Sequence, residues 1–99
     1  MHKNSRLIGL LGYLSTALGS DAFRVVDHWA SDLCAVGVAS RDDESRLAYI
    51  SVFNRSPGRC YFECERPKAG GEVEIVDRGE DVTYEELAVR VGRHLRPTR

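Results

Sequence analysis

The chain has 99 residues, of which 42% are hydrophobic and 29% charged, and its formal net charge is -1. This composition is typical of a globular protein, and the length suffices for one modest core, so we expect a single domain over residues 1–99. The nearly balanced charge gives no sign of a general nucleic-acid binder. The sequence has no long apolar run and no secretory cleavage pattern, which predicts a cytoplasmic protein without a membrane span.

Apolar periodicity and turn residues predict a helix, five strands and a second helix. These elements are expected over residues 4–18, 22–29, 33–40, 46–53, 59–65, 72–77 and 83–95. Short loops favour an antiparallel meander, and two amphipathic helices can cover one face of such a sheet. The sequence therefore predicts an α+β fold, a two-layer sandwich of about five strands with an N-terminal and a C-terminal helix on one face.

Local signals mark the ends of both helices. Asn4 can cap the first helix, and Gly19 suits the position after its end. Gly9 and Gly12 weaken that helix, and we expect them to allow its close approach to the sheet. The second helix opens with a capping box from Thr83 to Glu86 and a hydrophobic staple, and it ends before a proline. The staple residues are Val82 and Leu87.

Residues 46–65 predict the central hairpin, because β-branched and aromatic residues flank a loop of Asn, Ser, Pro and Gly at 54–58. With a five-residue loop at 41–45 before it, this hairpin sets the register of three strands. The expected pairs are Val52–Cys60, Ile50–Phe62, Ala48–Cys64 and Gly37–Tyr49. The first three pairs would lie on the core face, and the tyrosine would cover the glycine on the other face.

A loop at 66–71 would extend this register to the fifth strand, before a turn at 78–81. Val73 and Ile75 would then continue the core face, opposite Cys64 and Phe62. On the other face four carboxylates would meet beside two tyrosines. These residues are Glu63, Glu65, Glu72, Glu74, Tyr49 and Tyr61, with Leu47 and Phe53 nearby. An acidic, aromatic surface suits a basic protein partner, and a simply solvated face with a shifted register is the open alternative.

Catalytic and metal-binding patterns are absent from the sequence. Cys60 and Cys64 would lie about 13 Å apart on a strand, so we expect them, like Cys34, to be buried apolar residues and not ligands. The histidines are scattered, and His94 suits a helix C-terminus. Paired glutamates could imitate a glycosidase dyad, but a small open sheet offers little pocket for a sugar. The Asp27-His28-Trp29 run could also suggest catalysis, but an aromatic residue with polar neighbours at a strand end is the commoner explanation. We therefore expect no enzyme, cofactor or metal.

The layout of helix, meander and helix, with the segments 49–53, 59–65 and 76–87, resembles small immunity proteins of bacterial contact-dependent growth inhibition systems. This resemblance implies a cytoplasmic, non-enzymatic inhibitor of a toxin domain at the C-terminus of a secreted exoprotein. Such toxins are often nucleases, frequently acting on tRNA, with basic clefts. The acidic face would plug that cleft or mimic a phosphate backbone.

For this function we expect toxin contacts from Glu63, Glu65, Glu72 and Glu74, with Tyr49 and Tyr61 as anchors, and then from the loop acids Asp42, Asp43 and Glu44. Direct nucleic-acid binding is not expected. Two alternatives stay open. One is a structural or adaptor module that forms a homodimer through the mixed face. The other is a small RNA-binding regulator that uses the C-terminal arginines, namely Arg90, Arg93, Arg96 and Arg99.

Overall fold

The computed structural model describes residues 3–27 and 30–96. Its elements in chain order are α1 (Ser5–Leu18), β1 (Phe23–Val26), β2 (Ala35–Ser40), β3 (Leu47–Ser51), β4 (Arg59–Pro67), the 3-10 turn η1 (Ala69–Gly71), β5 (Val73–Thr83) and α2 (Tyr84–Leu95). The predictions for His2, His28, Trp29, Pro97 and Arg99 lie outside the described residues.

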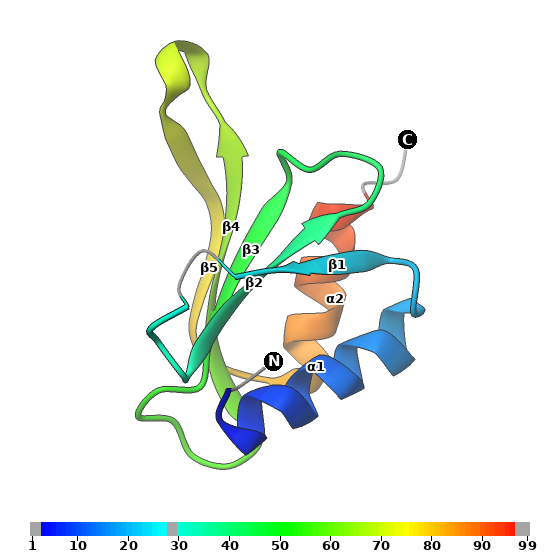
Figure 1. Ribbon diagram of the computed structural model, residues 1–99, viewed down its shortest axis with the longest axis vertical. Coiled ribbons are helices and arrows are strands. Elements are labelled where there is room, and N and C mark those ends of the chain that lie inside the picture. Colours follow the sequence, from blue (N-terminus) through cyan, green and yellow to red (C-terminus); the bar gives the residue numbers. More distant parts are fainter. Residues whose placement is uncertain (1–2, 28–29, 97–99) are drawn as a thin grey trace.

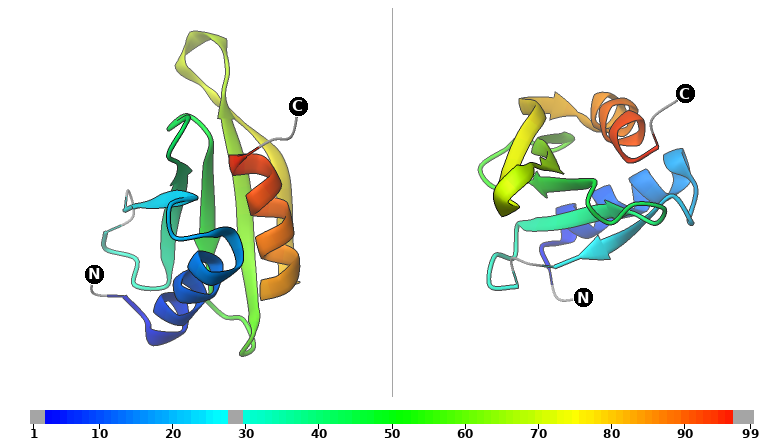
Figure 2. Two further views of the ribbon diagram at one scale, coloured as in Figure 1. Left: turned by 90° about the vertical axis from the view of Figure 1, so that its right-hand side faces the viewer. Right: turned by 90° about the horizontal axis from the view of Figure 1, so that it is seen from above.

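The five strands form one antiparallel sheet in the order β1-β2-β3-β4-β5, so every strand pairs with its neighbours in the chain. Both helices lie against the same face of this sheet (Figures 1 and 2). We call the face towards the helices the inner face and the opposite face the outer face. The predicted two-layer α+β meander is thus confirmed. Neither helix in the described ranges is long and apolar enough to cross a membrane.

The core fills the space between the helices and the inner face. Its fully buried side chains include Leu7, Leu10 and Leu14 of α1, Val36 and Val38 of β2, Ala48 and Ile50 of β3, Cys60, Phe62 and Cys64 of β4, and Leu87 and Val91 of α2. These residues recur at every second position of the strands and at helical spacing in α1 and α2, as each element's geometry requires. The predicted inner-face pairs Ile50–Phe62 and Ala48–Cys64 are confirmed.

The predicted caps hold both helices in place. The Asn4 side chain accepts a hydrogen bond from the Arg6 backbone N–H, and Gly19 follows α1 with a positive φ of 102°. The Thr83 hydroxyl accepts a bond of 3.1 Å from the Glu86 backbone N–H at the start of α2. Glu86 also accepts a hydrogen bond of 2.6 Å from Arg90, one turn further along the helix.

The prediction for Gly9 and Gly12 is wrong. Both glycines are exposed, and a Cβ atom added to either would meet no heavy atom within 4 Å. The close approaches in this fold occur at other glycines. A Cβ at Gly92 of α2 would lie 2.8 Å from Leu18 Cδ2, and a Cβ at Gly79 of β5 would lie 2.5 Å from Phe62 Cε1.

The predicted register between β4 and β5 is also wrong. Residues 78–81 are not a turn but part of β5, which continues to Thr83. Gly79 lies opposite Phe62, where the ring occupies the space that a side chain would need. Irregularities between Cys60 and Phe62 and between Cys64 and Glu65 then shift the pairing along the strand. Such bulges insert an unpaired residue, which a count at period two cannot follow.

The shifted register produces an arm that extends beyond both helices (Figure 1). This β4–β5 arm comprises residues 66–76. Val73 and Ile75, which were predicted to be in the core, are 61% and 48% exposed there. Gly79 and Val82 of β5 are buried at the core instead.

Candidate functional site

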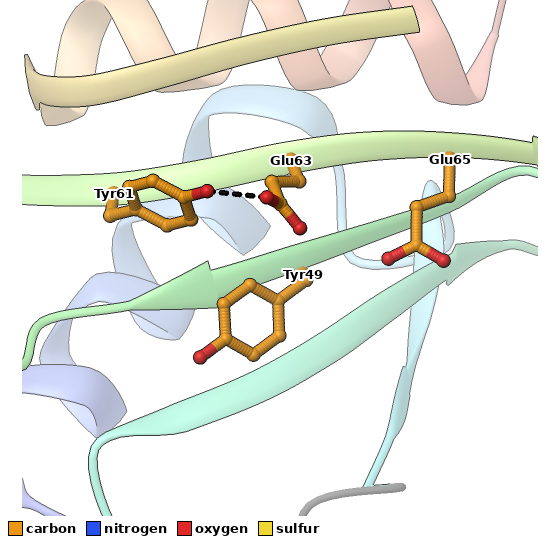
Figure 3. A pocket seen from close by; sticks show the side chains of 4 residues that line it. All are labelled: Tyr49, Tyr61, Glu63 and Glu65. Carbon is orange, nitrogen blue, oxygen red and sulfur yellow. Dashed lines mark hydrogen bonds between the residues drawn. The ribbon is translucent and has the colours of Figure 1, made fainter. Parts of the chain in front are cut away.

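The outer face carries an open pocket of about 380 Å³ over β3 and β4. Four side chains line it: Tyr49 of β3 and Tyr61, Glu63 and Glu65 of β4 (Figure 3). Strand alternation places them together, because the residues between the β4 three are the buried Phe62 and Cys64. All four lining residues are members of the predicted toxin-binding set.

Two tyrosine rings form the aromatic part of the pocket. The rings of Tyr49 and Tyr61 meet edge to face, with centroids 6.2 Å apart and planes at 73°. Tyr49 lies opposite the buried Gly37 of β2, which confirms the predicted pair. The guanidinium of Arg55 lies 5.8 Å from the centroid of the Tyr61 ring, and its Nε donates a 2.6 Å hydrogen bond to the Glu80 carbonyl. These contacts fix the orientation of the aromatic surface before any partner binds.

The polar groups of the pocket are two carboxylates and two phenols. The Tyr61 hydroxyl donates a hydrogen bond to the Glu63 carboxylate (Figure 3). Burial, that hydrogen bond and the charge of Glu63 raise the pKa of Tyr61, although the neighbouring Arg78 opposes the shift. Burial is also the main cause that raises the pKa of Tyr49, and the charges of Asp32 and Glu63 add to it. Both phenols therefore stay neutral at physiological pH.

The other two predicted glutamates lie elsewhere. Glu63 is opposite Arg78, and Glu74 is opposite Arg66 on the β4–β5 arm. Glu72 precedes β5 on the same arm. The predicted row of four neighbouring carboxylates is therefore wrong, because β5 pairs three residues further along than expected at Glu65. On β5 an arginine, and not a glutamate, is the cross-strand neighbour of Glu63.

The loop acids are also separate from the pocket lining. The Ser40 hydroxyl accepts hydrogen bonds from the backbone N–H groups of Asp42 and Asp43. The Asp43 carboxylate binds Ser45, and this contact is the main cause that lowers its pKa. Glu44 forms a 2.5 Å ion pair with Arg24 of β1. These contacts explain Asp43 and Glu44 as parts of the β2–β3 turn.

Sequence reasoning did not identify Arg55 and Arg78 as residues beside the pocket. Arg55 belongs to the loop at 54–58, which gave no signal that its side chain would turn towards Tyr61. Arg78 was assigned to a turn, because Gly79 beside it was read as a turn residue. Had Gly79 been read as a glycine that a buried ring covers, the longer β5 and the Glu63–Arg78 pair could have been predicted.

The side chains of Cys60, Cys64 and His94, which could in principle react or bind a metal ion, have structural roles. Burial raises the pKa of Cys60 and of Cys64 to about 12, as expected for cysteines that act as core residues. His94 is buried, and its Nε2 lies 3.1 Å from the Glu65 carbonyl oxygen and 3.2 Å from that of Leu47. Within residues 3–27 and 30–96, no three His, Cys, Asp or Glu side chains form a group that could hold a metal ion.

The C-terminal arginines that could have served RNA binding make contacts within the chain. Arg90 donates two hydrogen bonds to the Asp77 carboxylate, from Nη2 at 2.5 Å and from Nε at 3.1 Å. Arg96 lies 3.8 Å from the Asp21 carboxylate. Both arginines thus already face an acidic group.

Comparisons with protein-family models, with curated proteins and with solved structures gave no significant match to this chain.

Proposed function

We propose that this protein binds a basic protein domain through the outer-face pocket and thereby blocks that domain's activity, as an immunity protein of a contact-dependent growth inhibition system does. One observation carries the proposal: a preorganised pocket in which Tyr49 and Tyr61 stand beside Glu63 and Glu65. The resemblance described from the sequence supplies the class of partner, a toxin domain with nuclease activity.

The pocket chemistry suits a lysine or arginine side chain of the partner. A cation is attracted to the face of a tyrosine ring, and the neighbouring carboxylate can accept a charge-assisted hydrogen bond from it. Tyrosine is also enriched among the residues that dominate binding energy at protein interfaces. Because the rings and Glu63 are already in contact with each other, little side-chain freedom is lost on binding.

This protein would inhibit the toxin by occupying its active-site cleft. The clefts of nucleases are lined with basic side chains that contact phosphates, and an acidic surface with two carboxylates can occupy the same positions. The pocket residues lie on the outer face of the sheet. Both helices cover the other face (Figure 2), so a partner can approach the pocket without displacing α1 or α2. No catalytic step by this chain is needed for such a function.

The test compares two double substitutions with the same change in charge. The partner is the C-terminal domain encoded by the gene immediately upstream, and affinity is measured by calorimetry. Glu63→Lys with Glu65→Lys should weaken binding by at least about 100-fold, because like charges would then face each other in a buried contact. Glu72→Lys with Glu74→Lys is the control on the β4–β5 arm, and it should retain most of the affinity.

Two results would contradict the proposal. Equal loss of affinity in both double variants would mean that only the overall charge of the chain matters. Unchanged affinity in the pocket variant, with a circular dichroism spectrum like that of the wild type, would place the interface elsewhere.

A further inference from the structure

The outer-face pocket is smaller than the contact that a stable protein complex needs. Such interfaces bury about 800 Å² on each partner and involve about 20–30 residues a side. The pocket is lined by four side chains, so a domain that binds there must also contact the surface around it.

One side of the pocket offers a partner little surface. Tyr49 pairs with Gly37 of β2 there, and all six residues of β2 are buried. On the other side Glu65 pairs with Ile75 of β5, and Ile75 is 48% exposed. The open surface beside the pocket therefore lies on β5 and leads onto the β4–β5 arm (Figure 1).

An extra residue in β5 turns the apolar side chains of the arm towards the pocket face. Asp77 lies opposite the buried Cys64, so its side chain points to the inner face, and Ile75 would follow it there in a regular strand. The irregularity between Cys64 and Glu65 inserts Val76, and Ile75 lies opposite Glu65 instead. Bulges re-aim side chains in this way and are common next to functional sites.

The apolar residues of the arm form a strip that continues the surface of the pocket. Val73 lies opposite Pro67 and is 61% exposed, and Pro67 is exposed as well. Because residues directly opposite each other share a face, both lie, with Ile75, on the face that carries Glu65. We call Val73, Ile75 and Pro67 the outer apolar strip. Glu74, between Val73 and Ile75, points to the other face of the arm.

Contacts at the base of the arm fix its direction. Arg90 of α2 donates two hydrogen bonds to the Asp77 carboxylate and a third, of 3.0 Å, to the Arg78 carbonyl. The same guanidinium lies 4.8 Å from the centroid of the buried Phe62 ring. The outer apolar strip is therefore held beside the pocket before a partner arrives, which lowers the ordering cost of binding.

We propose that the outer apolar strip is a second contact for the same toxin domain, and that this domain carries an exposed apolar surface next to the basic residues of its cleft. This contact depends on the proposed function, because the pocket brings the domain to the strip. Cross-strand neighbours have Cβ atoms about 5 Å apart, and two residues along a strand add about 7 Å. The apolar surface of the partner thus begins about 5 Å from the cation that meets Glu65 and extends to about 12 Å from it.

The pocket and the strip contribute to binding in different ways. Carboxylates attract a basic domain over a distance and so raise its association rate, an effect that salt weakens. An apolar contact acts only at short range, so it slows dissociation and depends little on salt. The strip also suits a protein and not a nucleic acid, because Glu63 and Glu65 beside it would repel phosphates.

Surface plasmon resonance with the domain encoded by the gene immediately upstream, at two salt concentrations, tests this contact. Val73→Thr with Ile75→Thr should raise the dissociation rate at least about tenfold at both concentrations and change the association rate less than about twofold. Threonine keeps the β-branching that strands favour, and both positions are exposed, so the circular dichroism spectrum should match that of the wild type. The control is Ile8→Thr with Val89→Thr, a matched loss of exposed apolar groups on the two helices, which should leave both rates unchanged.

The outcomes separate the strip from the pocket. A second variant, Val73→Lys, places a cation against the basic domain and should also speed dissociation. If both strip variants dissociate like the wild type while Glu63→Lys with Glu65→Lys weakens binding, the strip contact is overturned and the proposed function stands. If the strip variants dissociate faster and the pocket variant binds like the wild type, the strip contact is supported and the pocket is not the site. Equal acceleration in the helix control, or a wild type that does not bind the domain, would overturn the strip contact.

Discussion

Gly79→Ala tests the contact that sets the register of β5. The added Cβ would lie 2.5 Å from Phe62 Cε1, 2.7 Å from Val82 Cγ1 and 3.1 Å from Phe62 Cδ1. Carbon atoms pack at about 3.5–4.0 Å, so the ring and the valine would have to move by about 1 Å. The ring has little room, because Phe62 is fully buried and the Arg90 guanidinium lies 4.8 Å from its centroid.

Overpacking of this kind typically costs about 1–3 kcal/mol of unfolding free energy. We expect the upper half of that range, about 2–3 kcal/mol, because both neighbours of the new methyl group are held in place and Arg90 is itself bound by Asp77. Urea denaturation followed by circular dichroism measures the difference. The matched control is Gly9→Ala, because a Cβ atom added at Gly9 would meet no heavy atom within 4 Å. This variant should be up to about 1 kcal/mol more stable than the wild type.

A Gly79→Ala protein within about 0.5 kcal/mol of the wild type would refute this reasoning, since that is the range of an ordinary surface substitution. It would mean that β5 can shift away from Phe62 at little cost. The register of β5, and with it the opposition of Glu63 and Arg78, would then rest on other contacts.

The same denaturation assay, repeated over a range of pH, tests the contribution of two titratable groups to the unfolding free energy. Asp77→Asn should cost up to about 1 kcal/mol at neutral pH. Its contact with Arg90 lowers the pKa of Asp77, so this contribution is present above about pH 4 and is lost as the pH falls through the lowered value. The variant should therefore lose less stability on acidification than the wild type; a parallel loss would contradict the assignment. Burial lowers the pKa of His94, so the unfolded chain takes up the proton first, and stability should fall as the pH drops from about 6.5 towards the lowered value. His94→Gln should flatten that part of the profile, and an unchanged slope would show that another group titrates there.

The sequence was sufficient for the three central strands. The register across both connections from β2 to β4 is the expected one, although β3 ends at Ser51 and not at residue 53. The pairs Gly37–Tyr49 and Tyr49–Glu63 follow from that regularity, so both tyrosines and both carboxylates of the pocket could be placed in advance.

The fifth strand could not be placed by the same means. The pairing at Glu65 already differs by three residues from the expected one, because β4 continues to Pro67 and β5 begins at Val73, so the predicted loop at 66–71 is misplaced. Two extra residues in β5 then shift the pairing by one residue each, which a count at period two cannot follow. Gly79 has two physical uses in a strand-rich sequence, as a turn residue and as a space for a ring, and local sequence does not separate them. The acidic half of the site was overestimated for this reason, because Glu72 and Glu74 were assigned to a face that they do not share with Glu63.

The order of the strands has a consequence for how the chain folds. Each strand pairs with its chain neighbours, so the sheet can grow hairpin by hairpin through contacts that close only short loops. The contact between the end of α2 and the segment after α1 is different: Arg96 Nη2 donates a 3.3 Å hydrogen bond to the Asp21 carbonyl across 75 residues. During synthesis, when the N-terminal part emerges first, the sheet can pair while the α2 side of its inner face still lacks a cover. Docking of the last helix then converts a half-covered sheet into a closed core.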